Sequence, residues 1–455
     1  MEPHRLRSVT LAIRHLGNSS LPAFELTRLS DGKSAAPVAI ASPYEALVEG
    51  RSGSNLMREL RWYLESFLDY PFPPESVHAE HVMDALRTWG SQAFNALFDQ
   101  RDAGEWLAGS DLLQVRSDDP GILSWPWEAL FDPQAHSYIA HQRRIERRLN
   151  QIPDPPTVAD LPQDRVNILL VVARPYEGDV RYRSIARPLI ELIQSQDLPV
   201  QVNILRPPTF DQLREHLRAR PSHYHLLHFD GHGAYGESAG AYSHRAPEGC
   251  LVFENEIGEA DPKSASDLSV LLREHAMPAV VLNACQSATL DERAAHVFAT
   301  VATALLQSGM RSVVAMAYSL YVRGAQVFLP SFYRRLFEAG NVAEAVRAGR
   351  QQMLADRLRF SARGPYPLDD WLLPVLYQQD PLEFDFARAA KRETTASHLP
   401  ADVKEYRDAY GFIGRDGPIL QMERALHRRA PCVLIWGLGG VGKTTLARGF
   451  SAVAG

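Results

Sequence analysis

Short apolar runs alternate with stretches of helical periodicity between residues 160 and 384, and this alternation limits the possible folds more than any other feature. Strands that take turns with helices form a parallel sheet whose connections are crossover helices. The sequence therefore predicts an α/β sandwich with a central, mainly parallel sheet. The predicted strands are residues 166–172, 200–205, 224–229, 279–282 and 312–317, and the predicted helices are residues 185–194, 210–219, 291–306, 325–336 and 342–358.

The first 150 residues have a different pattern. Residues 9–13 and 24–26 flank a Gly-Asn-Ser-Ser turn, which predicts an antiparallel strand pair. Apolar spacings of three and four predict amphipathic helices over 55–68 and 80–98. The charged run at 142–148 (QRRIERR) is interpreted as a solvated edge, with Ile145 facing inward.

Composition excludes several classes of protein. The formal net charge of −6 gives no general basic field, so we expect no nucleic-acid partner. The chain contains 3 cysteines, which is typical of a reducing compartment rather than of a disulfide-stapled secreted domain. No signal peptide or membrane-length apolar window is present, and we therefore expect a cytoplasmic protein without membrane contact.

Two potentially reactive side chains follow predicted strands. His232 lies in an Asp-Gly-His-Gly segment after one apolar run, and Cys285 lies in Asn-Ala-Cys-Gln-Ser after another. Ligands of open α/β sheets bind at the carboxyl ends of the strands, so the two residues can meet at that edge. A thiol needs a nearby imidazole to take its proton before it attacks a carbonyl. We therefore predict a catalytic pair of His232 and Cys285.

Neighbouring residues suggest supporting roles. The glycines around His232 leave the Gly233 N–H free of a sheet ladder, and with the Cys285 N–H it is predicted to form an oxyanion hole. Asp230 and Asn283 are compatible with orienting the base, with shaping the substrate pocket, or with packing. Cys250 has no Gly-His context and is given no catalytic role.

A metal site is not expected in this region. Strand alternation places His223 and His225 on one face and His228 on the other, so they cannot form one ligand set with His232. We therefore expect the pair of His232 and Cys285 to work without a cofactor.

The segments 227–233 (LHFDGHG) and 282–287 (LNACQS) resemble the paired motifs of the CHAT family of caspase-like peptidases. The resemblance extends to residues 61–65, 69–72, 123–128 and 370–377. It implies a caspase-like catalytic half at 160–384, preceded at 1–155 by a non-catalytic caspase-like half. Many relatives carry an acidic residue after the strand equivalent to 312–317, where this chain has Tyr318 and Arg323. The resemblance therefore leaves a basic P1 preference in doubt, and Arg323 is compatible with an acidic or uncharged P1 residue.

A second motif closes the sequence. The apolar run 432–436 is predicted to be a strand, and it enters a complete P-loop pattern that continues into a helix. In this pattern glycine N–H groups surround phosphate oxygens, Lys443 neutralises the β and γ phosphates, and Thr444 ligates Mg²⁺. The predicted nucleotide-binding residues are Gly437, Gly439, Gly440, Gly442, Lys443, Thr444 and Thr445.

The segment before the P-loop resembles the entry to STAND-type ATPases, the NB-ARC and NACHT relatives. By that resemblance, residues 385–408 form a linker and residues 409–455 the first part of a STAND P-loop NTPase that binds ATP or ADP and supports oligomerisation. The chain ends at Gly455, before any acidic magnesium partner, so we expect the ATPase module to be incomplete.

The combined prediction is a cysteine endopeptidase with a protein substrate, acting as the effector of a nucleotide-regulated bacterial signalling, immune or cell-death protein. Two alternatives remain open. The first is a catalytically silent caspase-like scaffold. The second is a docking domain attached to a nucleotide switch.

Overall fold

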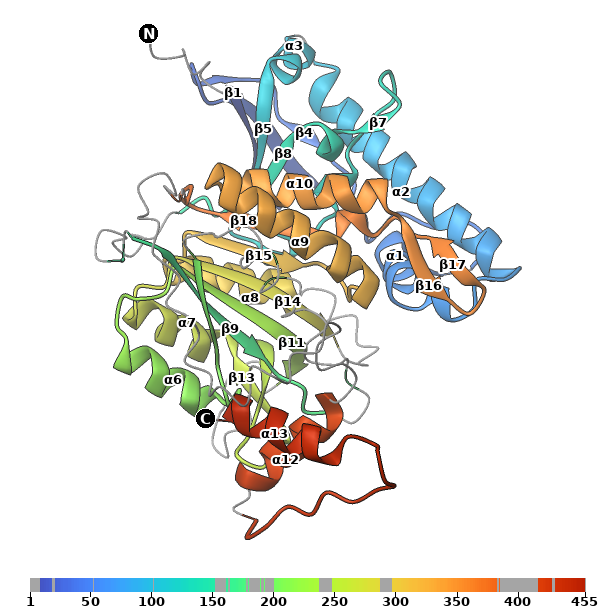
Figure 1. Cartoon of the computed structure of the whole chain (residues 1–455). Coiled ribbons are helices and arrows are strands. Elements are labelled where there is room, and N and C mark those ends of the chain that lie inside the picture. Colours follow the sequence, from blue (N-terminus) through green and yellow to red (C-terminus); the bar gives the residue numbers. More distant parts are fainter. Residues whose placement is uncertain are drawn as a thin grey trace.

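The computed structural model describes 15 stretches of the chain, and the remaining residues lie outside the description. These stretches are residues 9–18, 21–51, 53–100, 102–151, 161–162, 164–176, 179, 189, 192, 200–236, 248–286, 297–382, 384, 416–427 and 430–454. One 14-stranded sheet dominates the fold and carries helices on its faces (Figure 1).

The central block of this sheet has five parallel strands in the order β10, β9, β11, β14, β15. This arrangement confirms the predicted mixed α/β fold with a mostly parallel sheet. Their bounds are β9 Val166–Val172, β10 Val200–Ile204, β11 Leu226–Gly236, β14 Ala279–Gln286 and β15 Ser312–Met316. The hairpin of β12 (Glu248–Glu254) and β13 (Ala260–Ser264) continues from the far end of β11.

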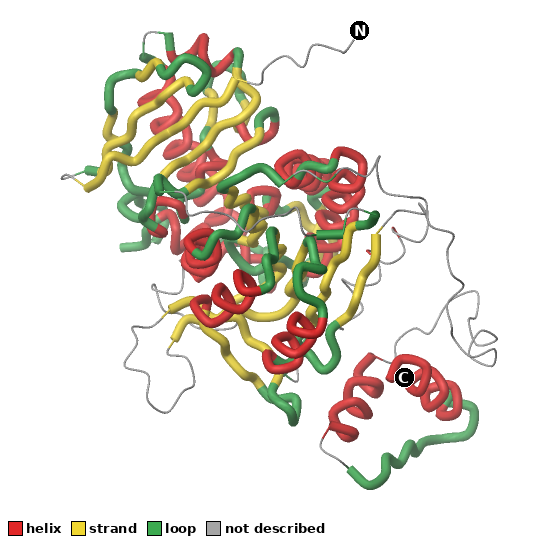
Figure 2. The backbone as a smooth tube through the Cα atoms, turned by 90° about the vertical axis from the view of Figure 1, so that its left-hand side faces the viewer, coloured by secondary structure: helices red, strands yellow, loops and turns green. Residues whose placement is uncertain are grey.

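The N-terminal block extends the same sheet. Its strands follow the order β8, β5, β1, β2, β3, and Figure 2 shows them toward the upper left of the molecule. The predicted antiparallel pair at the start of the chain is confirmed as β1 and β2. The bounds are β1 Val9–Asn18, β2 Pro22–Arg28, β3 Lys33–Ser34, β4 Val38–Ala39, β5 Ser110–Arg116 and β8 Arg144–Arg148.

Strand β18 (Pro374–Gln378) joins the two blocks, because it pairs antiparallel with β15 and parallel with β8. Strand β18 comes late in the sequence but thus lies between the central block and the N-terminal block. Two short ribbons lie outside the main sheet, β6 (Phe131–Asp132) with β7 (Ser137–Tyr138), and β16 (Leu358–Ser361) with β17 (Gly364–Pro367).

Helices cover both faces of the sheet, and several begin at a side-chain cap, such as Thr209 before α6 and Asn341 before α10. No helix in the described part of the chain is both long and apolar enough to cross a bilayer. The α-helices are α1 Leu56–Glu65, α2 Glu75–Phe98, α3 Ala103–Ala108, α4 Pro120–Leu123, α6 Phe210–Ala219, α7 Ala265–Glu274, α8 Val297–Gln307, α9 Val322–Ala339, α10 Val342–Ala355, α12 Asp416–His427 and α13 Lys443–Ala454. The 3₁₀ helices are η1 Phe67–Asp69, η2 Trp127–Ala129, η3 Ile139–His141 and η6 Asp370–Leu372.

The charged run at 142–148 is not a solvated edge, and that interpretation was wrong. Residues 144–148 form β8, which lies inside the sheet between β5 and β18, and Glu146 and Arg147 are each 1% exposed. Distant partners make this burial possible, because buried charges need paired or hydrogen-bonded surroundings. Glu146 accepts hydrogen bonds from Gln114 at 2.6 Å and from Gln378 at 2.8 Å.

Arg147 takes part in a buried ionic cluster that ties the two blocks together. Its guanidinium donates to both carboxylate oxygens of Glu128, at 2.6 and 2.7 Å. Arg350 of α10 donates to Glu128 Oε1 at 2.7 Å and to the carbonyl oxygen of Pro374 in β18 at 2.9 Å. Burial opposes ionisation of Glu128, but the two arginines outweigh it and hold the pKa of Glu128 below its usual value.

The apolar run 432–436 does not form a strand, which corrects the prediction for this segment. Its backbone has no strand partner among the described residues, and Leu434 and Trp436 are 83% and 87% exposed. A strand is stabilised by hydrogen bonds to a neighbouring strand, which apolar composition alone does not supply. The helix expected after the loop is present as α13.

His228 lies on the face of β11 that α9 covers. Its Nδ1 is hydrogen-bonded to the Tyr333 hydroxyl at 2.7 Å, and the two rings are stacked. Burial lowers the pKa of His228 from 6.5 to about 3. The folded protein therefore keeps this imidazole neutral over a pH range in which the unfolded chain binds a proton.

This difference predicts acid destabilisation. A depressed folded-state pKa stabilises the fold above pH 6.5, and that contribution is lost as the pH falls toward 3. Between pH 7 and pH 5 the free energy of unfolding of the wild type should fall by about 2 kcal/mol more than that of His228→Asn. Chemical denaturation at both pH values measures this, with the exposed His136→Asn as control. Equal pH slopes in wild type and His228→Asn would contradict the assignment.

Candidate active site

The two predicted catalytic residues lie on adjacent parallel strands. His232 is in β11 and Cys285 is in β14, and they are direct register partners across the β11–β14 ladder. Both strands run in the same direction in the middle of the central block (Figure 1). The structure describes the backbone of Cys285 but not its side chain.

A second register pair lies two residues earlier on each of the two strands. Asp230 and Asn283 are also register partners, and Asn283 Nδ2 donates to Asp230 Oδ1 at 2.8 Å. Successive residues of a strand alternate between faces, so positions two residues further along belong to the same face. Those positions are 232 and 285.

Asp230 and Asn283 form a buried network rather than a pocket lining. Asp230 is 3% exposed and Asn283 is 6% exposed. Arg174, which follows β9, donates to Asp230 Oδ2 at 2.5 Å and to the Asp230 carbonyl oxygen at 2.9 Å. Of the roles left open for Asp230 and Asn283, these contacts favour a supporting one beneath His232.

Asp179 is a site residue that was not predicted from the sequence. It lies after β9, and its Oδ1 is 2.6 Å from His232 Nε2, while the backbone N–H of Tyr176 donates to its Oδ2 at 2.9 Å. The Tyr176 ring lies edge-on against the imidazole, with centroids 4.9 Å apart. Its position after the strand that neighbours β11 was the available signal, since polar residues at the carboxyl end of three adjacent strands meet at one edge.

The Asp179 contact determines which nitrogen of His232 is available for proton transfer. A carboxylate only accepts hydrogen bonds, so Nε2 carries the hydrogen that Asp179 accepts. Nδ1 is buried and has no hydrogen-bond partner among the described residues. In this tautomer Nδ1 is a base with a free lone pair, oriented by a carboxylate through the other nitrogen.

The predicted oxyanion donor Gly233 is placed differently from the expectation. It lies within β11, with Leu251 of β12 and Gln286 of β14 as its register partners. A backbone N–H within a sheet points along the ladder toward a neighbouring strand. In this structure Gly233 is therefore not free of the ladder, and an oxyanion role requires the end of β11 to separate from a neighbour.

The pocket candidates after β15 are already engaged. Tyr318 is buried at 6% exposure, and Arg323 donates to Asp356 Oδ2 at 2.8 Å. Glu65 of α1 was not predicted to act here, but its Oε1 accepts a hydrogen bond from the Ser319 N–H at 2.9 Å. Arg61 neutralises Glu65 through a contact of 2.7 Å, so these groups leave no unpaired charge in this segment.

Cys250 differs from Cys285 in its surroundings. It lies in β12, is 1% exposed, and its thiol faces the Glu248 carbonyl oxygen at 3.6 Å. Burial raises the pKa of the Cys250 thiol to about 11. Cys250 is therefore protonated at neutral pH, and its environment does not favour nucleophilic chemistry.

The chain is thus an α/β protein with a mostly parallel sheet, and it carries a histidine and a cysteine as register partners on adjacent strands. The CHAT domain family, a family of caspase-like peptidases, matches residues 88–382, which is more than half of the 455 residues. The chain belongs to the CHAT family. The match begins within α2, includes both strands of the site, and ends before the P-loop segment.

Comparison with solved structures adds distant likenesses. Two structures of the separase–securin complex from Saccharomyces cerevisiae, at 3.0 and 2.6 Å resolution, match with 17% and 16% identity and TM-scores of 0.31 and 0.32. The matches cover 60% and 73% of this chain but only 15% and 21% of the separase chains. A structure described only as a protease matches with 12% identity and a TM-score of 0.38, covering 66% of this chain and 69% of that chain. No curated protein matches the sequence.

The tautomer of His232 provides a direct test of the Asp179 contact. A hydrogen bond to an ionised partner contributes roughly 1.5–3 kcal/mol, so Nε2–H should predominate by at least about tenfold in the wild type. In Asp179→Ala the two neutral tautomers should become comparably populated. Nitrogen-15 NMR of selectively labelled histidine at pH 8 distinguishes the two forms. Asp261→Ala is the control, and a variant spectrum identical to that of the wild type would contradict the role of Asp179.

Proposed function

We propose that this chain is a cysteine endopeptidase in which Cys285 is the nucleophile and His232 the general base. One observation carries the proposal, namely the direct pairing of residues 232 and 285 on adjacent parallel strands. The side-chain hydrogen bond between Asp230 and Asn283, which lie two residues before His232 and Cys285, supports the placement of positions 232 and 285 on one face of the sheet. Membership of a family of caspase-like peptidases supports the reaction class.

The proposed reaction begins with proton transfer from the Cys285 thiol to His232 Nδ1. The thiolate then attacks the substrate carbonyl carbon, and the electron pair of the carbonyl bond moves onto oxygen. His232 returns the proton to the leaving amine as the peptide bond breaks, and water later hydrolyses the thioester. Asp179 stabilises the imidazolium through Nε2 during these steps, because their separation of 2.6 Å is that of a charge-assisted hydrogen bond.

The oxyanion would be bound by the N–H groups of Gly233 and Cys285. The neighbour of β11 changes from β9 to β12 between Asp230 and His232, and the pairing of β11 with β14 ends at Gly233. We propose that substrate binding opens the ladder there. This step makes the active arrangement dependent on the substrate, as in other sites that are completed on binding.

Covalent labelling tests the peptidase proposal. In a Cys432→Ser background, which removes an exposed thiol, a peptidyl electrophile directed at thiols should modify Cys285, and the label should be absent when Cys285→Ala is added. In His232→Ala the labelling rate at pH 7 should fall at least about 100-fold, because the thiol loses its base. Mass spectrometry locates the label, and the buried Cys250→Ala serves as the matched control. Equal labelling in wild type and His232→Ala would instead favour a catalytically silent scaffold.

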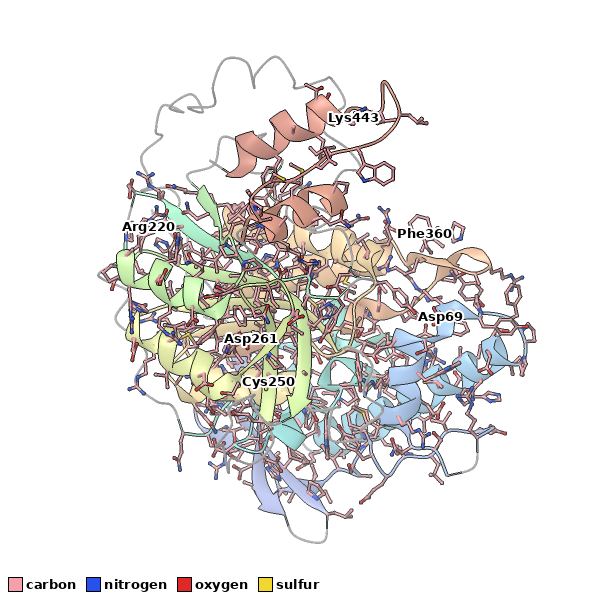
Figure 3. All side chains as sticks on the ribbon, turned by 90° about the horizontal axis from the view of Figure 1, so that it is seen from below. Asp69, Arg220, Cys250, Asp261, Phe360 and Lys443 are labelled. Carbon is pink, nitrogen blue, oxygen red and sulfur yellow. The ribbon has the colours of Figure 1, made fainter. Side chains whose placement is uncertain are left out.

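We propose a second function for residues 430–454, the binding of a nucleotide phosphate. The Lys443 ammonium is positioned by the loop itself, donating to the carbonyl oxygens of Gly437 and Leu438 at 3.0 and 2.8 Å. Gly440 and Gly442 have φ values of +77° and +80°, which glycine adopts without strain, and α13 starts at Lys443. Figure 3 shows Lys443 at the end of α13 that adjoins the loop.

These features fit the group that the sequence motif implies. Lys443 and the loop N–H groups of Gly437, Gly439, Gly440 and Gly442 would hold the phosphates of ATP or ADP, and Thr444 with Thr445 would face Mg²⁺ and the phosphates. The bound nucleotide would supply a ligand-dependent signal. On this proposal the peptidase is the effector of a STAND-type protein, and a role in bacterial immunity or cell death follows from that pairing.

Nucleotide binding can be measured on this chain directly. A fluorescent ATP analogue with Mg²⁺ should bind the wild type, and Lys443→Ala should weaken binding at least about tenfold through loss of a charge-assisted phosphate contact. Lys263→Ala, which removes a lysine paired with Asp261, is the control. The same affinity for wild type and Lys443→Ala would contradict the phosphate-binding proposal.

A further inference from the structure

Arg424 of α12 contacts the central block close to the proposed catalytic residues. Its guanidinium donates to the carbonyl oxygen of Arg174, and it lies 3.7 Å from Glu254 Oε2. The Glu254 side chain is 4% exposed and that of Arg424 is 23% exposed. Arg424 thus contacts both a largely buried carboxylate and a backbone carbonyl. The planar guanidinium suits this arrangement because it carries several N–H donors in a fixed geometry.

Arg174 and Glu254 are part of the support beneath His232. The Arg174 N–H donates to Glu254 Oε1 at 2.8 Å, and the Arg174 guanidinium holds Asp230, two residues before His232. The segment that carries Asp179 to the imidazole starts at the next residue, Pro175. Arg424 therefore binds Arg174, the residue directly before this segment.

The turn between β12 and β13 is shaped around the same arginine. Gly258 lies in this turn with a φ of +81°, and a Cβ added there would be 2.6 Å from Arg424 Nε. Any side chain at position 258 would displace the guanidinium. Figure 1 shows α12 below this end of the central block, where the β12–β13 hairpin ends.

Helix α12 is in turn packed against the P-loop helix. Leu446 and Phe450 of α13 form a small apolar cluster with Met422 of α12 and with Ile435, which precedes the loop. The cluster is separate from the main core of the sheet. A displacement of α13 would therefore be transmitted to α12 and to Arg424.

We propose that Arg424 is a latch through which α12 controls the proposed catalytic site. With α12 docked, Arg424 fixes Arg174 and Glu254, and the segment to Asp179 keeps His232 in its active orientation. When α12 leaves, this segment loosens and the reactivity of Cys285 falls. The proposal rests on the proposed function, and it specifies the regulation of that same site.

Hydrogen exchange of the whole chain tests the latch independently of catalysis. In Arg424→Ala, the hydrogen-bonded amides of Arg174, Tyr176 and Asp179 should exchange about 2- to 10-fold faster than in the wild type, as expected for the loss of one net hydrogen bond. Gly258→Ala should also accelerate the exchange of these amides, because its methyl group would displace the Arg424 guanidinium. Gln421→Ala removes an exposed side chain of the same helix and should change nothing. Unchanged exchange of the Arg174, Tyr176 and Asp179 amides in both Arg424→Ala and Gly258→Ala would overturn the latch.

The alkylation rate of Cys285 reports on the site itself. The measurement uses iodoacetamide in a Cys432→Ser background, because Cys432 is exposed. Arg424→Ala should slow the reaction and Gln421→Ala should not; an Arg424→Ala rate equal to that of the wild type would overturn control of the site by the latch. If wild-type Cys285 reacted no faster than a free cysteine while exchange still increased in Arg424→Ala, the catalytic proposal would fail and the structural latch would stand.

Discussion

The pairing of β11 with β14 is the constraint on which the proposed site depends. Parallel strands bring their carboxyl ends to one edge, and the register determines which residues face each other there. In this chain the register sets His232 opposite Cys285 and Asp230 opposite Asn283. A shift of one residue would transfer either side chain to the opposite face of the sheet. The buried bond between Asp230 and Asn283, strengthened by Arg174, opposes such a shift.

The same sheet connects the site to the rest of the molecule. Strand β18 joins the central and N-terminal blocks, and the cluster of Glu128, Arg147 and Arg350 secures this junction. Removing one member would leave a buried charge without its partner, which is far more costly than losing a surface ion pair. The N-terminal block also contacts the segment that follows β15, the neighbour of β14, because Glu65 accepts a hydrogen bond from the Ser319 N–H.

The sequence was sufficient to predict the parts of the fold that follow from local periodicity. The parallel strands of the central block are present close to where they were predicted, although β11 and β14 continue to Gly236 and Gln286 and so contain residues 232 and 285, which were expected just after them. Contacts between distant segments could not be predicted in this way. Asp179 is 53 residues before His232 in the sequence and is hydrogen-bonded to it. Strand β8 is buried because Glu128 pairs with Arg147 and Gln378 donates to Glu146. The segment 432–436 was predicted to be a strand from composition, but pairing requires a neighbour.

The proposed function requires Cys285 and His232 to form one catalytic pair. The most direct measurement is a crystal structure of the protein after reaction with a peptidyl chloromethyl ketone. We expect the peptide to be covalently attached to Cys285, with Sγ about 3–4 Å from His232 Nδ1 and with His232 Nε2 still hydrogen-bonded to Asp179. A structure with Sγ and the imidazole on opposite faces of the sheet would contradict the claim.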